Sequence, residues 1–199
     1  MSAFELRRDA DRGALDAGWL HARFSFPFGE HVDRAHPRFG PLLALNEDRV
    51  QPATGFPMHP HRDLEIVMLP RRGAVEHQDS QGRRMTVRPG ELQWMRAGRG
   101  IQHRQWNASD AAEDHHFQIW FEPGRRGLEP AVERRRYAMP DPGRWRVLVA
   151  PAAEGADALD IGVDVRLALG AAAPGAARAL PARPGGLYLH LLPGRATLH

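Results

Sequence analysis

Short apolar stretches separated by turns dominate the first two thirds of the chain. Residues 20–26 alternate between apolar and polar side chains, and apolar runs follow at 39–45, 64–69 and 117–121. Alternation with a period of two is typical of a strand with one buried face, and a short apolar run between turns fits a strand buried on both faces. Because no convincing amphipathic-helix pattern interrupts these stretches, the sequence predicts an all-β barrel or sandwich.

The residues between these stretches predict how the strands connect. Residues 74–78 and 83–87 flank Asp79-Ser80-Gln81-Gly82, whose composition suits a tight hairpin reversal. A second turn at 88–91 contains a Pro-Gly pair and leads into a further short strand. Irregular backbone is expected at 1–18, 46–48 and 50–56.

The pattern weakens after residue 130. The strand candidates there are 145–150, 161–169 and 187–192, and the stretch between the last two is rich in alanine, glycine and proline. We therefore expect two domains, with residues 1–130 forming the barrel that carries the functional site. Residues 131–199 are expected to form a linker and a partial C-terminal barrel that is short or truncated.

Composition narrows the classes of function. The 199 residues carry a formal net charge of +3, every basic residue is an arginine, and there is no cysteine. The missing cysteine excludes disulfides, thiolate metal sites and thiol catalysis. The arginines are interspersed with acids instead of forming one basic stripe, so we expect no direct nucleic-acid partner. Without an apolar run long enough to span a membrane or a signal-peptide core, a cytoplasmic protein with no membrane partner is expected.

Three histidines form the strongest candidate site. His59 and His61 are one residue apart, so their side chains point to the same side of a strand. His103 follows the predicted hairpin and the Pro-Gly turn, and imidazoles from two strands that converge inside an antiparallel barrel can hold a divalent transition metal. The alternative is that they are buried histidines satisfied by the barrel's own polar groups. The other nearby histidines are expected in the hairpin (His77) or in a loop (His115 and His116).

Two ordered motifs surround these histidines. The first consists of Gly55, His59, His61, Glu65 and Gly73, and the second consists of Gly82, Pro89, Gly90 and His103. Three short motifs that are more specific than these two occur at 76–80 (Glu-His-Gln-Asp-Ser), 93–95 (Gln-Trp-Met) and 97–101 (Ala-Gly-Arg-Gly-Ile). The set resembles the cupin superfamily and, within it, the pirin family with its bacterial quercetinase-like members. The similarity is dense from Gly55 to Tyr137 and thin afterwards.

The resemblance implies a bicupin, which is a pair of jelly-roll β-barrels face to face with metal in the N-terminal barrel only. Pirin-like proteins hold iron or another divalent ion through three histidines and a glutamate, which fall here on His59, His61, His103 and Gln105. Fe(II) is expected, with Mn, Ni, Cu or Zn as alternatives that such ligands accept. Glutamine offers only a neutral amide oxygen, so ligation by Gln105 is weak. Direct ligation by Glu65 stays open, the other role for Glu65 being to orient a histidine N–H.

The resemblance also implies a quercetin 2,3-dioxygenase-type reaction, in which a flavonol or related enolic aromatic is cleaved with O2. The family's glutamate accepts the enol proton of the substrate, and this catalytic position is occupied here by Gln105. Because an amide cannot accept that proton, we expect a metal site retained in geometry and a turnover that is reduced or redirected. Phe56 and Met58 flank the ligands and are expected to contact the small aromatic substrate.

Other classes of function stay open. The resemblance also includes non-catalytic pirin-like proteins that carry metal and bind a protein partner, and Gln105 favours that reading because binding needs no base. A different metal-dependent oxidase or a cupin isomerase is a third hypothesis. Release of carbon monoxide from quercetin with consumption of O2 separates the first hypothesis from the others.

Overall fold

The computed structural model describes residues 4–154, 157–177, 179–180, 184–192, 194 and 196–197 of the chain. In this part of the chain nearly all regular structure is β, and the helices are the short 3-10 turns η1 (Asp9–Asp11) and η2 (Ala152–Glu154). The strands are β1 (Gly13–Asp16), β2 (Leu20–Phe24), β3 (Leu42–Val50), β4 (Gly55–His61), β5 (Glu65–Arg72), β6 (Val75–Asp79), β7 (Arg84–Val87), β8 (Glu91–Arg96), β9 (Ile101–Asn107), β10 (Asp114–Phe121), β11 (Ala131–Arg136), β12 (Trp145–Val149) and β13 (Leu167–Gly170). Among the described residues, no helix has the length and apolar character needed to cross a membrane.

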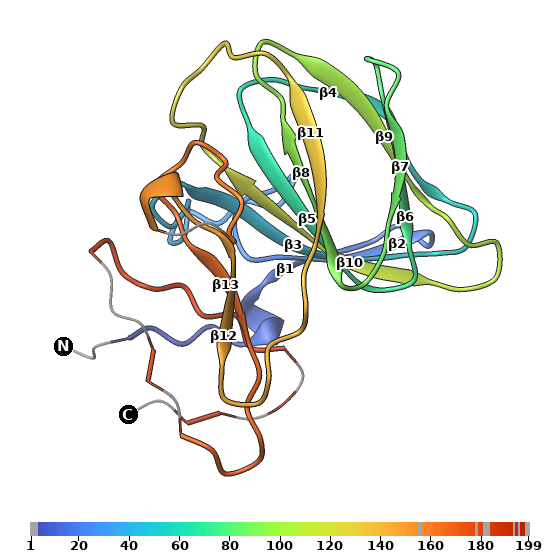
Figure 1. The fold of residues 1–199 in the computed structure, drawn as a ribbon. Coiled ribbons are helices and arrows are strands. Elements are labelled where there is room, and N and C mark those ends of the chain that lie inside the picture. The colour runs from blue at the N-terminus through green and yellow to red at the C-terminus, as the bar shows by residue number, and fades with distance from the viewer. Residues whose placement is uncertain are drawn as a thin grey trace.

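Two antiparallel sheets build the main body of the molecule. The larger has seven strands in the order β1-β2-β3-β10-β5-β8-β11, and the smaller has four in the order β4-β9-β6-β7. Figure 1 shows the small sheet on the right, standing against the large sheet with an interior between them. Neighbours such as β3 and β10 are far apart in sequence, as expected for the predicted jelly roll.

The two faces of the large sheet differ in chemistry. Asn46 of β3 lies opposite Gln118 of β10, and Gln118 reaches Gln105 of β9, so this face is turned toward the small sheet. Leu45 and Ile119 are also cross-strand partners, and they belong to the largest apolar core. Because successive side chains alternate between faces, the residues of the largest apolar core lie on the outer face. The interior receives polar side chains such as Gln118 together with apolar ones such as Met68.

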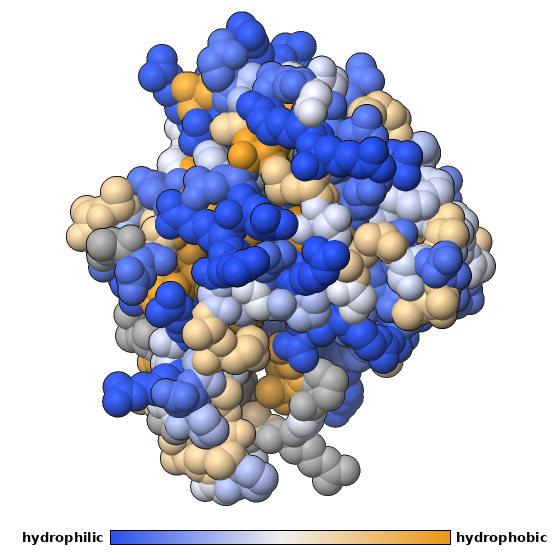
Figure 2. Space-filling view, turned by 45° about the vertical axis from the view of Figure 1, so that its right-hand side comes forward, coloured by the Kyte–Doolittle hydropathy of each residue, from blue (hydrophilic) through white to orange (hydrophobic). Residues whose placement is uncertain are grey.

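The chain after β11 covers that outer face. Leu148, Ile161 and Val163 are buried in the same apolar core as the outer residues of β5, β8 and β10. Tyr188 packs against Phe26, with ring centroids 5.4 Å apart. Each fully buried aliphatic or aromatic side chain stabilises the fold by ~1.5–3 kcal/mol, so much of the stability arises outside the barrel interior. The face shown in Figure 2 is largely hydrophilic, with hydrophobic atoms only in small patches.

Several expected elements are confirmed. The hairpin is formed by β6 and β7, which pair from Val75↔Val87 to Gln78↔Arg84. β8 and the buried strand β10 lie where they were predicted, and β12 lies within the 145–150 candidate. The 161–169 candidate is a strand only from Leu167, where β13 begins and pairs with β12, and residues 161–166 are not in a strand. β11 pairs with β8 in the large sheet, and the proposed domain boundary after residue 130 stays a prediction.

Other expectations were wrong, mostly where polar residues form strands. The lead-in contains β1, the predicted turn at 46–48 lies inside β3, and His115 and His116 lie in β10. These polar residues occupy strands because the barrel interior and the ion pairs around it accept polar side chains, which a pattern of apolar residues does not reveal. The segment 187–192 contributes packing to the core without joining a sheet.

Candidate metal centre

The three predicted histidines meet inside the barrel. His59 and His61 point to the same side of β4, and His103 of β9 is the direct cross-strand partner of His59. One nitrogen from each of the three rings lies within 4.8 Å of the others. Their ring centroids are 4.5 to 4.9 Å apart. This spacing matches three ligands that share one ion.

Glycine allows β4 and β9 to approach closely beside the histidines. A Cβ atom at Gly55 would lie 2.3 Å from the backbone carbonyl oxygen of Gln105 and 2.6 Å from the Cα atom of Trp106. A larger residue would therefore push the strands apart at the start of the ladder. The register also shifts between Phe56 and His59, which is the irregularity that brings His59 opposite His103.

The unpartnered ring nitrogens fit a metal ion. The Nδ1 atom of His59 lies 2.7 Å from the carbonyl oxygen of Pro57, which leaves Nε2 free. The Nε2 atoms of His61 and His103 are buried without a hydrogen-bond partner among the described residues. Buried polar atoms are rarely left unsatisfied, so these two nitrogens, close to the ring of His59, fit a shared metal ion.

Burial favours the neutral form of two of the three candidate ligands, and a histidine must be neutral to bind a metal. Burial, together with the neighbouring His59, lowers the pKa of His61 to about 4. Burial and the neighbouring imidazoles lower the pKa of His103 to about 2. Both rings therefore offer lone pairs at neutral pH, and an incoming cation does not have to displace protons from them.

Gln105 lies one inward position beyond His103 on β9 and is buried. Its Oε1 atom accepts a hydrogen bond from Nε2 of Gln118 on β10. The residue is therefore held by the opposite sheet, and its role as a ligand or in catalysis stays a proposal.

The proposed substrate contacts lie beside the open side of the histidines. Phe56 packs edge-on against Trp19, with ring centroids 5.2 Å apart, and its ring centroid is 6.3 Å from that of His59. The side chain of Met58 is 45% exposed. Trp120 forms a further wall, with its ring centroid 5.0 Å from that of His61.

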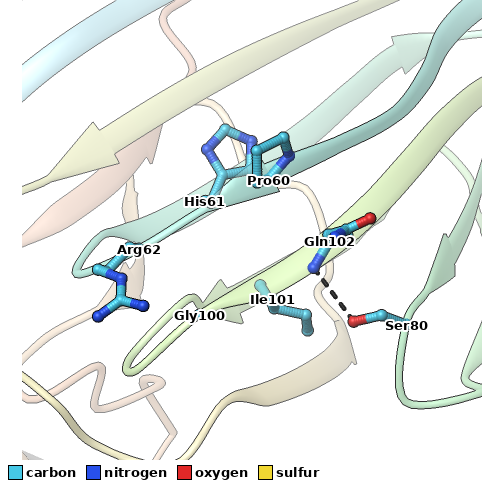
Figure 3. Close-up of a pocket in the computed structure, with 7 residues that line it drawn as sticks. All are labelled: Pro60, His61, Arg62, Ser80, Gly100, Ile101 and Gln102. Carbon is cyan, nitrogen blue, oxygen red and sulfur yellow. Dashed lines mark hydrogen bonds between the residues drawn. The ribbon is translucent and has the colours of Figure 1, made fainter.

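A shallow pocket of about 460 Å³ lies at the end of β4 and β9. Its lining residues are Pro60, His61, Arg62, Ser80, Gly100, Ile101 and Gln102. Figure 3 shows His61 and Gln102 on neighbouring strands with their side chains directed differently, and Ser80 Oγ accepting a hydrogen bond from the backbone N–H of Gln102. The pocket therefore adjoins the histidines without containing all three of them.

Glu65 is placed away from the histidines. It begins β5 in the large sheet and accepts hydrogen bonds from Nε1 of Trp94 at 2.7 Å and from Nε of Arg96 at 3.1 Å. The strand parity that suggested an inward orientation does not apply, because the chain turns between β4 and β5 and Asp63 has a positive φ of 49°. Glu65 thus anchors the outer face of the sheet.

Two buried histidines were not expected from the sequence, one beside His103 and one on β10 elsewhere in the barrel. His77 is fully buried, and its Nδ1 atom lies 3.4 Å from Nδ1 of His103. His116 lies between two acids, with Nδ1 2.5 Å from Oδ1 of Asp114 and Nε2 3.6 Å from Oδ2 of Asp48. The alternation of Val75, His77 and Asp79 is the one sequence signal that could have placed His77 inside.

Comparison with known proteins agrees with this geometry. A profile of the pirin family matches residues 4–121, which is more than half of the chain. The chain belongs to the pirin family. A Mycobacterium tuberculosis relative, whose name proposes quercetin 2,3-dioxygenase activity, is 38% identical over 196 residues, covering 98% of this chain and 80% of the relative.

Two Escherichia coli proteins add to the comparison. A quercetin 2,3-dioxygenase is 39% identical over 132 residues, covering 66% of this pirin and 57% of the relative. The solved structure of the bacterial pirin YhhW in complex with nickel(II) has a TM-score of 0.76 and 34% identity, over 81% of this chain and 69% of that one. The relatives and the histidine geometry together imply a divalent metal in this pirin.

Proposed function

We propose that this pirin is a metal-dependent oxidoreductase of the quercetin 2,3-dioxygenase type, which cleaves a flavonol or related enolic aromatic with O2. The observation that carries the proposal is the convergence of three imidazoles, on His59, His61 and His103, with one nitrogen from each within 4.8 Å of the others. The names of the Mycobacterium tuberculosis and Escherichia coli relatives support the substrate class.

Fe(II) is the ion that we propose, and Mn, Ni, Cu or Zn are the alternatives that the ligands accept. When bound, the ion would supply Lewis-acid activation of the enol and a place for O2. His103 is buried, whereas His59 and His61 are only half-buried, so the accessible side of the site is at β4. Phe56 and Met58 lie on that strand, where we propose that they contact the aromatic rings.

Gln105 is the residue that would set this pirin apart. We assign it the fourth position beside the ion and the place of the catalytic carboxylate, where it offers a neutral amide. An amide cannot take the proton of the substrate, so turnover should be slow and should rise with pH as the substrate ionises in solution. Its hydrogen bond with Gln118 supports this assignment, because that bond holds the amide inside the barrel.

The proposal is tested by assaying metal-loaded and metal-free protein with quercetin as the substrate. The expected result is uptake of O2 and release of carbon monoxide by the protein loaded with Fe(II), and neither by the metal-free protein. Gln105→Glu is expected to raise turnover and metal affinity by supplying the base. Gln102→Glu is the control, because Gln102 is on the same strand with its side chain exposed. Loaded protein without O2 uptake contradicts the dioxygenase assignment, and unchanged turnover in Gln105→Glu contradicts the role of Gln105.

A second candidate function is a metal-dependent regulatory pirin that binds a protein partner. The neutral Gln105 favours it, because a binding surface controlled by metal needs no base at this position. Pull-down of partners with and without chelator is the corresponding test. Capture that depends on metal, combined with no O2 uptake, supports this function over the enzymatic one.

A further inference from the structure

A line of polar side chains leads from His103 on β9 to His77 and Asp79 on the neighbouring strand β6. Nδ1 of His103 lies 3.4 Å from Nδ1 of His77, and Nε2 of His77 lies 3.6 Å from Oδ2 of Asp79. The side chains of His77 and Asp79 are fully buried. Neither of these contacts joins two acids or two cations, so each contact can have one proton donor and one acceptor.

The order of protons along this line follows from the ligand role of His103. A nitrogen that binds a metal must be unprotonated, so His103 has to carry its proton on Nδ1 when Nε2 is the ligand. That N–H then donates toward Nδ1 of His77, which must be the acceptor. His77 consequently carries its own proton on Nε2, facing the carboxylate of Asp79.

Asp79 is held as a carboxylate with a fixed orientation. Its Oδ1 atom accepts hydrogen bonds from the backbone N–H groups of Gln81 at 2.9 Å and Arg83 at 3.0 Å. Its Oδ2 atom accepts one from the guanidinium of Arg83 at 3.2 Å and faces His77. An acceptor-only group therefore stands at the end of the line, where it favours a proton on the facing nitrogen of His77.

We propose that Asp79 and His77 are positioning residues that set the tautomer of His103 and keep its Nε2 lone pair directed at the metal. This inference rests on the proposed metal site and adds two residues that the histidine motif does not contain. Neither residue touches the ion, so both act through His103.

Asp79→Asn tests the inference because it reverses the direction of hydrogen-bond donation along the line with little change in side-chain shape. Oδ1 of the asparagine keeps both turn hydrogen bonds, so its amide NH2 takes the place of Oδ2. That NH2 gives up the hydrogen bond from the Arg83 guanidinium and donates to His77. The proton of His77 then moves to Nδ1, and His103 becomes protonated on Nε2. Nickel(II) affinity, measured by competition with a chelator, is expected to fall ~10–100-fold, as for other losses of an outer partner of a metal ligand.

The tautomer of His103 gives a second readout that needs no metal. Imidazole ¹⁵N NMR of the metal-free protein should show the proton on Nδ1 in the wild type and on Nε2 in Asp79→Asn. Glu76→Gln is the matched control, since Glu76 lies on β6 and pairs with Arg84 and Arg104 instead of the histidines. It should leave both the tautomer and nickel(II) affinity unchanged.

Variants of His77 distinguish positioning from mere packing. His77→Gln supplies a carbonyl oxygen that can accept from His103 and should keep affinity within a few-fold, whereas His77→Leu should weaken it ~10–100-fold. Equal affinity of these two variants, or an Asp79→Asn protein with wild-type tautomer and affinity, overturns the inference. If the wild type fails to bind nickel(II), the proposed metal site is wrong, and the metal-free NMR comparison still decides the tautomer.

Discussion

The barrel interior contains two groups of buried histidines that have opposite surroundings. His103 is surrounded by other imidazoles, and its pKa is lowered by burial and by those rings. Burial by itself would lower the pKa of His116, but the hydrogen bond with Asp114 and the charges of Asp114 and Asp48 together raise it. The comparison shows that neighbours, more than burial, decide whether a histidine offers a lone pair to a metal or holds a proton as part of an ion pair.

The largest expected effect is on metal binding. His103→Ala removes one of the three proposed ligands, and nickel(II) affinity should fall by more than the ~10–100-fold that loss of an outer partner costs. His116→Gln should bind nickel(II) like the wild type, because both nitrogens of His116 face acids. Isothermal titration of the two variants measures this, and equal losses of affinity would contradict the division into two groups.

The next effect is on stability. His116→Ala leaves Asp114 and Asp48 buried without their cation, so the free energy of unfolding should fall by ~3–5 kcal/mol at neutral pH. Metal-free His103→Ala should lose less, because its partner His77 is uncharged and no buried carboxylate is stranded. Urea unfolding of the metal-free proteins gives both free energies of unfolding. A larger loss in His103→Ala than in His116→Ala would contradict this prediction.

Neighbouring acids on β3 should give pH effects of opposite sign. Burial raises the pKa of Asp48 to about 6, so its favourable contribution is complete below about pH 3.8 and is lost as pH rises through 6. Asp48→Asn, which mimics the protonated form, should therefore be more stable than the wild type at pH 7 by ~1–3 kcal/mol.

The pKa of Glu47, the neighbouring acid, is shifted in the opposite direction to that of Asp48. A hydrogen bond with His115 and the pairing with Arg12 lower the pKa of Glu47 to about 2, despite partial burial. Its contribution is present above about pH 4.5 and is lost as pH falls toward 2, so Glu47→Gln should be less stable at pH 7 by ~1–3 kcal/mol. Thermal unfolding between pH 3 and 8 compares the two variants, and shifts of the same sign at pH 7 would refute the assignment.

The smallest effect should come from the residue that links β10 with β9. Gln118→Leu removes the donor to Gln105, which should lower the free energy of unfolding by ~1 kcal/mol and change nickel(II) affinity by no more than a few-fold. Chemical unfolding and the same chelator competition measure it. A loss of affinity as large as that of His103→Ala would show that Gln105 needs Gln118 to act as a strong ligand.

The sequence by itself determined the strand-rich architecture, the central hairpin and the three metal-binding candidates. Turn residues act locally, and the period of two directs His59 and His61 to one side whatever the rest of the chain does. Those features depend on residues close together in the chain, so they can be recognised without knowing the fold.

Only the tertiary structure decided which face each polar residue occupies. Glu65 proved to lie on the outer face because the chain turns before it, and His116 proved to lie inside because β10 pairs with β3. The contacts of His77 with His103, and of Gln118 with Gln105, likewise depend on which strands are neighbours and in which register. A one-residue change of register would send every one of these side chains to the opposite face, and register is fixed by packing across the whole sheet.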